Sequence, residues 1–170
     1  GRSTHYLATS LMNANKEDVK IYCIDTFEGS SEHANIKLPK DFMHMTRENL
    51  KFFVGRNMVN LCQGRSDSKE ILDKFADESV DYVMVDGAHE YEPVRDDVIN
   101  WWPKLKKDGV MFGDDVELTS VLEGMKAGLR DRKMPTYGTN NGREQTWYCT
   151  KNGDNQGLEK LIPGVNVLHE

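Results

Sequence analysis

Acidic residues and a histidine follow two apolar runs of the sequence, and their side chains suit metal binding and proton transfer. Asp86 comes directly after residues 80–85, and the pair Asp114-Asp115 comes directly after residues 109–113. Converging carboxylates repel one another unless a cation joins them, and Mg²⁺ prefers hard oxygen ligands. His89 follows Asp86 closely and titrates near neutral pH, so it could take a proton from a substrate hydroxyl. These residues could therefore hold a magnesium ion beside a histidine base.

Each of these residues also has a purely structural interpretation. Asp86-Gly87 can form a turn, and Asp114-Asp115 can begin a helix, where negative charge is favourable. His89 can be a surface or helix-capping residue. The spacing alone leaves both interpretations open.

Asp25 is a further candidate, because it ends the apolar run of residues 19–24. In a nucleotide-binding sheet, an acid at the end of the second strand can accept hydrogen bonds from both ribose hydroxyls. The alternative is an aspartate of a turn or a helix cap.

The elements that must position these residues alternate between strand and helix. Apolar patterning predicts strands over residues 19–24, 58–62, 80–85 and 109–113, and helices over residues 4–16, 46–56, 67–75, 91–101 and 118–132. This alternation predicts one α/β domain over residues 1–170, with a Rossmann-like, doubly wound, mostly parallel sheet. Strands near Thr136 and over Gln145–Thr150, around the turn Asn140-Asn141-Gly142, predict a C-terminal antiparallel hairpin. Ligands of such sheets bind at the carboxyl ends of the strands.

The composition excludes several classes of protein. The 170 residues include 22 Lys and Arg against 28 Asp and Glu, a net charge of −6 that argues against a general nucleic-acid binder. No apolar run approaches the roughly 20 residues of a membrane span. The three cysteines lie far apart and form no disulfide framework or metal finger, which favours a cytoplasmic location. The polar stretch of residues 26–40 is long enough to be a lid over a binding site.

Residues 80–116 (VDYVMVDGAHEYEPVRDDVINWWPKLKKDGVMFGDDV) resemble class I S-adenosylmethionine-dependent methyltransferases. The most similar branch is that of small-molecule O-methyltransferases with the signature Asp-Gly-x-His-x-Tyr, which includes macrocin-type enzymes; catechol O-methyltransferase is a more distant likeness. Gly1-Arg2-Ser3-Thr4 resembles the tail of the family's first motif. Residues 21–27 resemble its second strand with the ribose-binding acid, and Gly64-Arg65-Ser66 resembles the segment that borders the adenine.

The resemblance implies a role for each matching residue. Mg²⁺ or another divalent cation would be bound by Asp86, Asp114 and Asp115, and the catalytic residues would be His89, as the base, and Asp86. Contacts to S-adenosylmethionine would come from Gly1, Ser3, Thr4, Asp25, Thr26, Phe27, Gly64, Arg65, Ser66, Asp86, Gly87, Ala88 and His89.

The resemblance also implies a first strand and most of a glycine-rich loop before Gly1. Residues 165–170 form an apolar run that ends in Glu, as that strand does in the family. We therefore expect residues 165–170 to fill the position of the first strand, by circular permutation or by exchange between chains. The alternative is an ordinary C-terminal strand.

These observations together predict a magnesium-assisted O-methyltransferase that methylates a hydroxyl of a small molecule. A sugar or a natural product fits the resemblance better than a catechol does. One alternative is a metal-independent methyltransferase. The other is a cofactor-binding relative without this activity, because cephalosporin hydroxylases share the signature. A homodimer is a further expectation, since relatives often dimerise.

Overall fold

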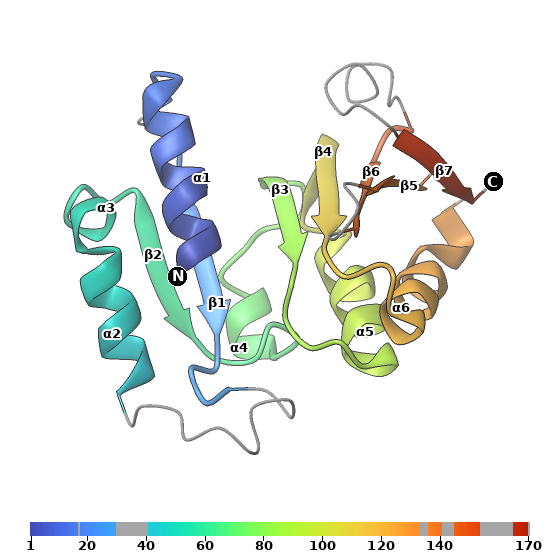
Figure 1. Cartoon of the computed structure of the whole chain (residues 1–170), viewed down its shortest axis with the longest axis horizontal. Helices are drawn as coiled ribbons and strands as arrows, with labels where there is room; N and C mark the ends of the chain where they lie inside the picture. Colours follow the sequence, from blue (N-terminus) through green and yellow to red (C-terminus); the bar gives the residue numbers. More distant parts are fainter. Residues whose placement is uncertain (17, 30–40, 133–135, 141–144, 154–164, 170) are drawn as a thin grey trace. The chain divides into compact units, whose positions relative to one another are not determined.

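The computed structural model describes residues 1–16, 18–29, 41–132, 136–140, 145–153 and 165–169 of the chain (Figure 1). The chain divides into two compact units, Gly1–Ile71 and Leu72–Glu170. Most of the predicted lid and the residues Asn141 and Gly142 of the predicted turn lie outside the described residues. Among the described residues, no helix is both long and apolar enough to cross a membrane.

The first unit contains two parallel strands with helices packed against one of their faces. Its elements are α1 (Arg2–Asn13), β1 (Ile21–Asp25), α2 (Phe42–Asn49), α3 (Lys51–Gly55) and β2 (Val59–Gln63). Side chains alternate between the faces of a strand. One face of this pair therefore carries Ile21, Cys23, Val59 and Leu61, which pack with α1 and α3 in one apolar cluster.

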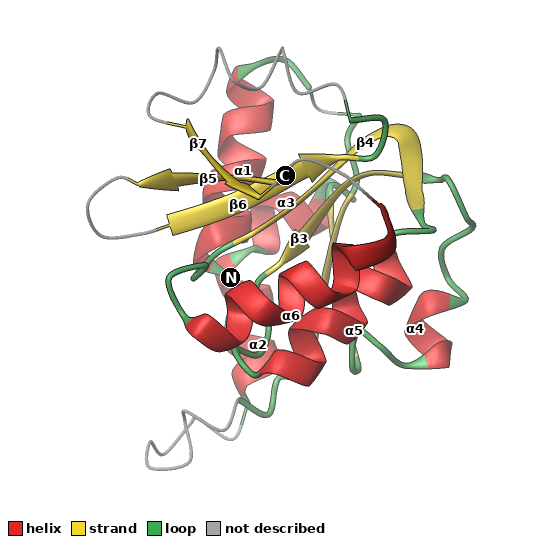
Figure 2. Cartoon of the chain, turned by 90° about the vertical axis from the view of Figure 1, so that its right-hand side faces the viewer, coloured by secondary structure: helices red, strands yellow, loops and turns green. Residues whose placement is uncertain are grey.

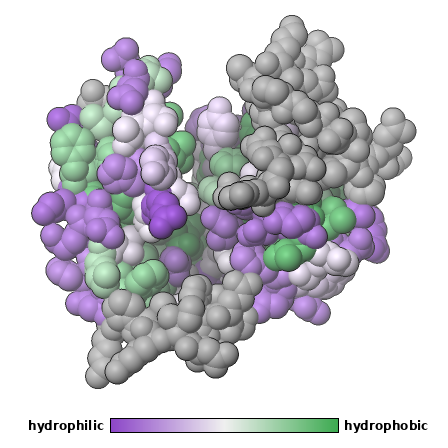
Figure 3. Space-filling model, in the orientation of Figure 1, coloured by the Kyte–Doolittle hydropathy of each residue, from purple (hydrophilic) through white to green (hydrophobic). Residues whose placement is uncertain are grey.

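The helix predicted over residues 46–56 is in fact two helices, α2 and α3. Leu50 links them with φ −105° and ψ 7°, outside helical geometry, and its side chain is fully buried in the core of the first unit. Phe53 is also buried, whereas Met45 and Phe52 are exposed on the outer side of the two helices. Apolar surface is visible over this part of the unit in Figure 3. Leu50, at the break between the two helices, is therefore part of the core of the first unit.

The second unit is built on a five-stranded sheet with the order β3-β4-β6-β5-β7. Its elements, with α4 crossing the boundary between the units, are α4 (Lys69–Leu72), β3 (Val80–Val85), α5 (Tyr91–Trp101), β4 (Leu105–Gly113), α6 (Thr119–Leu129), the 3₁₀ turn η2 (Arg130–Arg132), β5 (Thr136–Asn140), β6 (Gln145–Thr150) and β7 (Val165–His169). β3 and β4 run parallel, and β6 pairs antiparallel with both β4 and β5. The predicted Rossmann-like α/β fold with a C-terminal antiparallel hairpin is thus confirmed.

Helices α5 and α6 lie together on one face of this sheet (Figure 2). Glycines of α6 allow the two helices to touch. A Cβ atom on Gly124 would lie 2.6 Å from the backbone oxygen of Tyr91, and one on Gly128 would lie 2.6 Å from Cβ of Val98. Close packing therefore brings the first turn of α6 near the residues that precede α5.

The expectation that residues 165–170 fill the position of the first strand is wrong. β7 pairs antiparallel with β5 at the edge of the sheet, with Thr136 opposite His169 and Thr139 opposite Val165. β6 occupies only one edge of β5, and the other edge offers unpaired N–H and C=O groups that a further strand can satisfy. An apolar run fits an edge position as well as it fits a central position. The composition of residues 165–170 therefore does not distinguish the edge beside β5 from the position of the first strand.

Gly113, the last residue of β4, is expected not to tolerate a side chain. A Cβ atom there would lie 2.5 Å from Nε1 of the fully buried Trp147 and 2.6 Å from the backbone oxygen of Val85. We expect Gly113→Ala to lower the free energy of unfolding by about 1–3 kcal/mol or more, the usual cost of overpacking a core. Urea denaturation measures the change.

Gly55→Ala is the matched control, because a Cβ atom on Gly55 would meet no atom of the described residues within 4 Å. Gly55 ends α3, where alanine favours the helix by up to about 1 kcal/mol. Equal stability of the two variants would contradict the close contact at Gly113.

Candidate functional site

In the second unit, the ends of β3 and β4 bring acidic residues to the same edge of the sheet. The two strands are parallel and in register at their last residues, Val85 and Gly113. Asp86 and Asp114 therefore leave neighbouring strands at the same level. This is the edge at which the sequence predicted a magnesium site.

His89 and Asp115 are in direct contact at this edge. Nε2 of His89 lies 2.9 Å from Oδ2 of Asp115, and the two side chains are 27% and 34% exposed, so a small ligand can reach both. Asp115 has a left-handed backbone with φ 57°, which aspartate tolerates better than most residues do. Its N–H donates to Oδ1 of Asp114 at 3.0 Å, and its backbone oxygen accepts from Leu118 N–H at 2.9 Å.

Asp86 completes a group of three potential metal ligands with His89 and Asp115. One ligand atom from each lies within 4.8 Å of the other two. The two carboxylates suit a hard divalent cation such as Mg²⁺ or Mn²⁺, whereas the imidazole is a ligand that Zn²⁺ or Fe²⁺ prefers. Asp114 is not a member of this group, and its side chain accepts the hydrogen bond from Asp115 instead. The donor set fits a cation, with Asp114 beside it.

The surroundings of Asp86 raise the pKa of its carboxyl group above the ordinary value of 3.8. Loss of hydration is the main cause, followed by the negative charges of Asp114 and Asp115, while His89 acts in the opposite direction. A bound cation would relieve the repulsion among these carboxylates.

The raised pKa predicts a stabilising effect of Asp86→Asn in the metal-free protein. The folded state binds the Asp86 proton more tightly than the unfolded chain does. The protonated carboxyl therefore contributes its full stability below pH 3.8, and that stability is lost as pH rises through the raised pKa. We expect Asp86→Asn to raise the melting temperature at pH 7, and the difference from wild type to shrink toward pH 3.8.

Asp67→Asn is the control of opposite sign. The hydrogen bonds from the Arg65 guanidinium, at 2.9 and 2.7 Å, lower the pKa of Asp67. Asparagine there should lower the melting temperature slightly at pH 7. Thermal melts from pH 3.5 to 8 measure both, and a destabilised Asp86→Asn protein at pH 7 would contradict the prediction.

In the first unit, the structure brings together residues predicted to bind the cofactor. Asp25 ends β1, and its Oδ1 accepts a hydrogen bond from Phe27 N–H at 2.7 Å. Its backbone oxygen accepts from Gly64 N–H at 2.9 Å, and Thr26 accepts from the side chain of Gln63 at 3.2 Å. Gly64 has φ +150° and little room for a side chain beside Ile71. Asp25, Thr26 and Phe27 thus form a turn after β1 that is hydrogen-bonded to Gln63 and Gly64 at the end of β2.

The other residues predicted to contact the cofactor have different surroundings. Arg65 forms an ion pair with Asp67 at 2.7 Å, and Ser66 follows it. Thr4 points from α1 to β1, where its Oγ1 lies 3.3 Å from Sγ of Cys23. Ser3 lies in the first turn of α1. In the second unit, Gly87 and Ala88 lie in the connection between Asp86 and His89.

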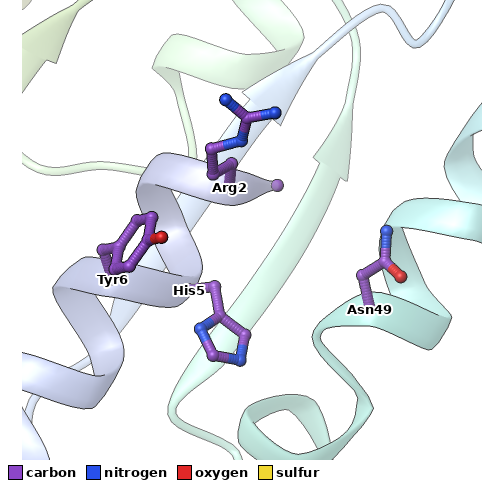
Figure 4. A pocket seen from close by; sticks show the side chains of 5 residues that line it. Arg2, His5, Tyr6 and Asn49 are labelled. Carbon is purple, nitrogen blue, oxygen red and sulfur yellow. The ribbon is translucent and has the colours of Figure 1, made fainter.

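An open pocket beside the start of α1 includes residues that the sequence did not single out (Figure 4). Its lining is Gly1, Arg2, His5, Tyr6 and Asn49. His5 on α1 and Asn49 at the end of α2 lie on opposite sides of it. Of these residues only Gly1 had been predicted. The sequence signal for these residues is that His5 and Tyr6 follow Arg2 by one helical turn, so all three lie on one side of a helix. Many surface helices have polar residues at this spacing, so the spacing does not indicate a pocket.

Comparison with known proteins gives relatives in both sequence and structure. A region of 97 residues is 31% identical to the "Uncharacterized protein y4gI" of Sinorhizobium fredii (strain NBRC 101917 / NGR234), covering 57% of this chain and 10% of that protein. The apo structure of CalS11, a TDP-rhamnose 3'-O-methyltransferase of calicheamicin biosynthesis, has a TM-score of 0.54 and 18% identity, over 77% of this chain and 58% of the other. An O-methyltransferase family protein from Burkholderia thailandensis has a TM-score of 0.59 and 12% identity, over 88% and 48%.

These likenesses differ in what they establish. The chain spans about half the length of the two solved structures, and at these identities they show the fold. The model of one protein family, described as a methyltransferase domain, matches residues 1–116, which include Asp86, His89 and Asp115. Over that region, the chain belongs to the methyltransferase-domain family.

Proposed function

We propose that this protein is an S-adenosylmethionine-dependent O-methyltransferase that acts on a hydroxyl of a small molecule with the help of a divalent cation. The observation that carries the proposal is the contact of His89 with Asp115 beside Asp86, at the ends of two parallel strands. Membership of the methyltransferase-domain family supports S-adenosylmethionine as the methyl donor, and the matched region contains His89, Asp115 and Asp86.

The reaction needs a base at the acceptor hydroxyl. The methyl group of a sulfonium is already activated, so the acceptor oxygen attacks its carbon, a C–O bond forms and the C–S bond breaks. The electron pair of the C–S bond stays on sulfur, which gives S-adenosylhomocysteine. His89 takes the hydroxyl proton at a ring nitrogen, and general-base catalysis of this kind contributes about 10²–10⁴-fold in rate.

Asp115 orients the base. Its Oδ2 contacts Nε2 of His89, which fixes the ring and stabilises the imidazolium that forms when the proton is taken. A carboxylate has two oxygens, so Asp115 can serve His89 and a cation together. Asp86 and Asp115 would hold the cation, with Asp114 beside them. When bound, the cation would lower the pKa of the acceptor hydroxyl and orient it.

In the first unit, we propose that the turn of Asp25 binds the ribose of the cofactor. One oxygen of Asp25 accepts from Phe27 N–H, and this bond holds the carboxylate at the end of β1. Carboxylates at such strand ends accept hydrogen bonds from ribose hydroxyls.

A sugar hydroxyl is the acceptor we favour. CalS11, which shares the fold, is a TDP-rhamnose 3'-O-methyltransferase. Sugar hydroxyls are weak acids, so their protons are hard to remove. A histidine base can take the proton, and a cation held by the two carboxylates would make the hydroxyl more acidic. Glycosylated natural products contain the same hydroxyls.

Two experiments test the proposal. Calorimetric titration with S-adenosylhomocysteine, with and without Mg²⁺, is expected to show micromolar binding. Methyl-labelled S-adenosylmethionine is then offered with nucleotide sugars, glycosides and catechols, and we expect label in the sugar products. Absence of binding together with absence of transfer would contradict the proposal.

A metal-independent methyltransferase is the second candidate. The His89–Asp115 contact at 2.9 Å favours it, because this pair could work as a base and its orienting acid without a cation. Methyl transfer that is unchanged in excess EDTA would favour this candidate, and loss of transfer that Mg²⁺ restores would favour the first.

A further inference from the structure

We propose that Ser120 is a positioning residue for His89, an inference that rests on the function proposed above. The hydroxyl of Ser120 donates a hydrogen bond to the backbone oxygen of His89, with 2.6 Å between the two oxygen atoms. Ser120 lies in the first turn of α6, 31 residues after His89 in the sequence. The bond therefore links two segments that only the fold brings together.

The chain that follows β4 holds His89 at two points. Oδ2 of Asp115 contacts the imidazole, and Oγ of Ser120 contacts the main chain of the same residue. Asp115 and Ser120 are themselves joined by a turn, in which Leu118 N–H donates to the oxygen of Asp115 at 2.9 Å. A residue fixed through both its backbone and its side chain has little freedom to turn its ring away.

The packing of α6 against α5 explains how the hydroxyl reaches this carbonyl. Ser120, Gly124 and Gly128 are spaced four residues apart, so they lie on one face of α6. The two glycines let that face touch α5, as the 2.6 Å distances from their hypothetical Cβ atoms show. Ser120 continues the same face one turn earlier, level with the residues that precede α5, where its hydroxyl meets the carbonyl of His89.

Positioning of this kind matters for a general base. The base must lie within about 2.6–3.2 Å of the group whose proton it takes. A misplacement of about 1 Å can cost on the order of 100-fold in rate. Without the Ser120 hydroxyl, this hydrogen bond between α6 and the main chain of His89 is lost, and we expect the connection from Asp86 to His89 to shift and the ring to leave Asp115.

Ser120→Ala tests this role. We expect kcat for methyl transfer to fall by about 10- to 100-fold, with KM for S-adenosylmethionine unchanged. The second readout is ¹⁵N-edited NMR of histidine-labelled protein at neutral pH, in which the His89 Nε2–H signal, held by Asp115, should weaken or disappear. His89→Gln assigns that signal.

The matched control is Ser79→Ala, because Ser79 Oγ donates to the backbone oxygen of Ala76 at 2.7 Å. It removes the same type of bond before β3, whereas His89 follows β3. It should leave both kcat and the His89 signal unchanged. Ser120→Thr keeps the hydroxyl and should restore both readouts.

Two results would overturn the proposal. One is a Ser120→Ala protein with wild-type kcat and a wild-type His89 signal. The other is a wild-type protein without the Nε2–H signal, since the His89–Asp115 contact would then not persist in solution. If wild type transfers no methyl group to any acceptor, the proposed function fails, and the NMR comparison still decides the role of Ser120.

Discussion

His89→Ala is expected to lower the kcat of methyl transfer by about 10²–10⁴-fold, the usual contribution of a general base. Alanine keeps the backbone between β3 and α5 but removes the only ring nitrogens of the Asp86, His89 and Asp115 group. Affinity for S-adenosylhomocysteine should fall far less than kcat, because His89 is one of several residues expected to contact the cofactor, whereas the proposed proton transfer depends on His89 alone. Steady-state kinetics with the best acceptor, together with calorimetry, measure the two quantities.

His44→Ala is the control for this variant. His44 is exposed on α2 in the first unit and has no part in the proposed reaction. The kcat of the His44→Ala variant should equal that of wild type. A His89→Ala protein that retains more than about a tenth of wild-type kcat would show that His89 is not the base.

Asp115→Asn is expected to weaken the binding of Mn²⁺, used as a probe for the divalent cation, and to lower kcat by more than about 100-fold. Changing a residue that merely supports a metal ligand costs about 10–100-fold, and Asp115 is proposed both to bind the cation and to orient His89. The asparagine side chain has nearly the size of aspartate but lacks the negative charge. That charge is needed both to bind the cation and to orient His89. Electron paramagnetic resonance of free Mn²⁺ measures the affinity.

Asp81→Asn is the matched control for the loss of one negative charge. Asp81 lies in β3 and pairs with Lys106 on the surface, with 2.8 Å between the charged atoms. Exposed pairs contribute roughly 0–1 kcal/mol to stability, so the variant should fold and keep wild-type Mn²⁺ affinity. Equal Mn²⁺ affinity of Asp115→Asn and wild type would exclude Asp115 from the cation site.

The sequence predicted the strands that carry the site because each is a clear apolar run with an aspartate behind it. The apolar run of residues 80–85 predicted a strand, in which Val83 and Val85 are buried and Tyr82 and Met84 are exposed, and its end placed Asp86 at the ligand-binding edge. The family expectation is confirmed by the match over residues 1–116.

The finer geometry of the site depends on features that residue types do not reveal. Whether Asp114 or Asp115 meets His89 is decided by the left-handed backbone of Asp115 and by its hydrogen bond to the Asp114 side chain. Ser120 gave no signal in the sequence, because its role arises from the close approach of α5 and α6. The position of β7 depended on which strand edge was open, and the residue types around Leu50 do not reveal the break of the helix there.

The measurement that tests the central claim most directly is anomalous diffraction from crystals of the protein grown with MnCl₂. Manganese scatters anomalously, so the difference map shows where the ion is bound. We predict a peak within coordination distance of carboxylate oxygens of Asp86 and Asp115, next to the ring of His89. A map without a peak at these residues, at an Mn²⁺ concentration that saturates the protein in solution, would contradict the claim that they form a divalent-cation site.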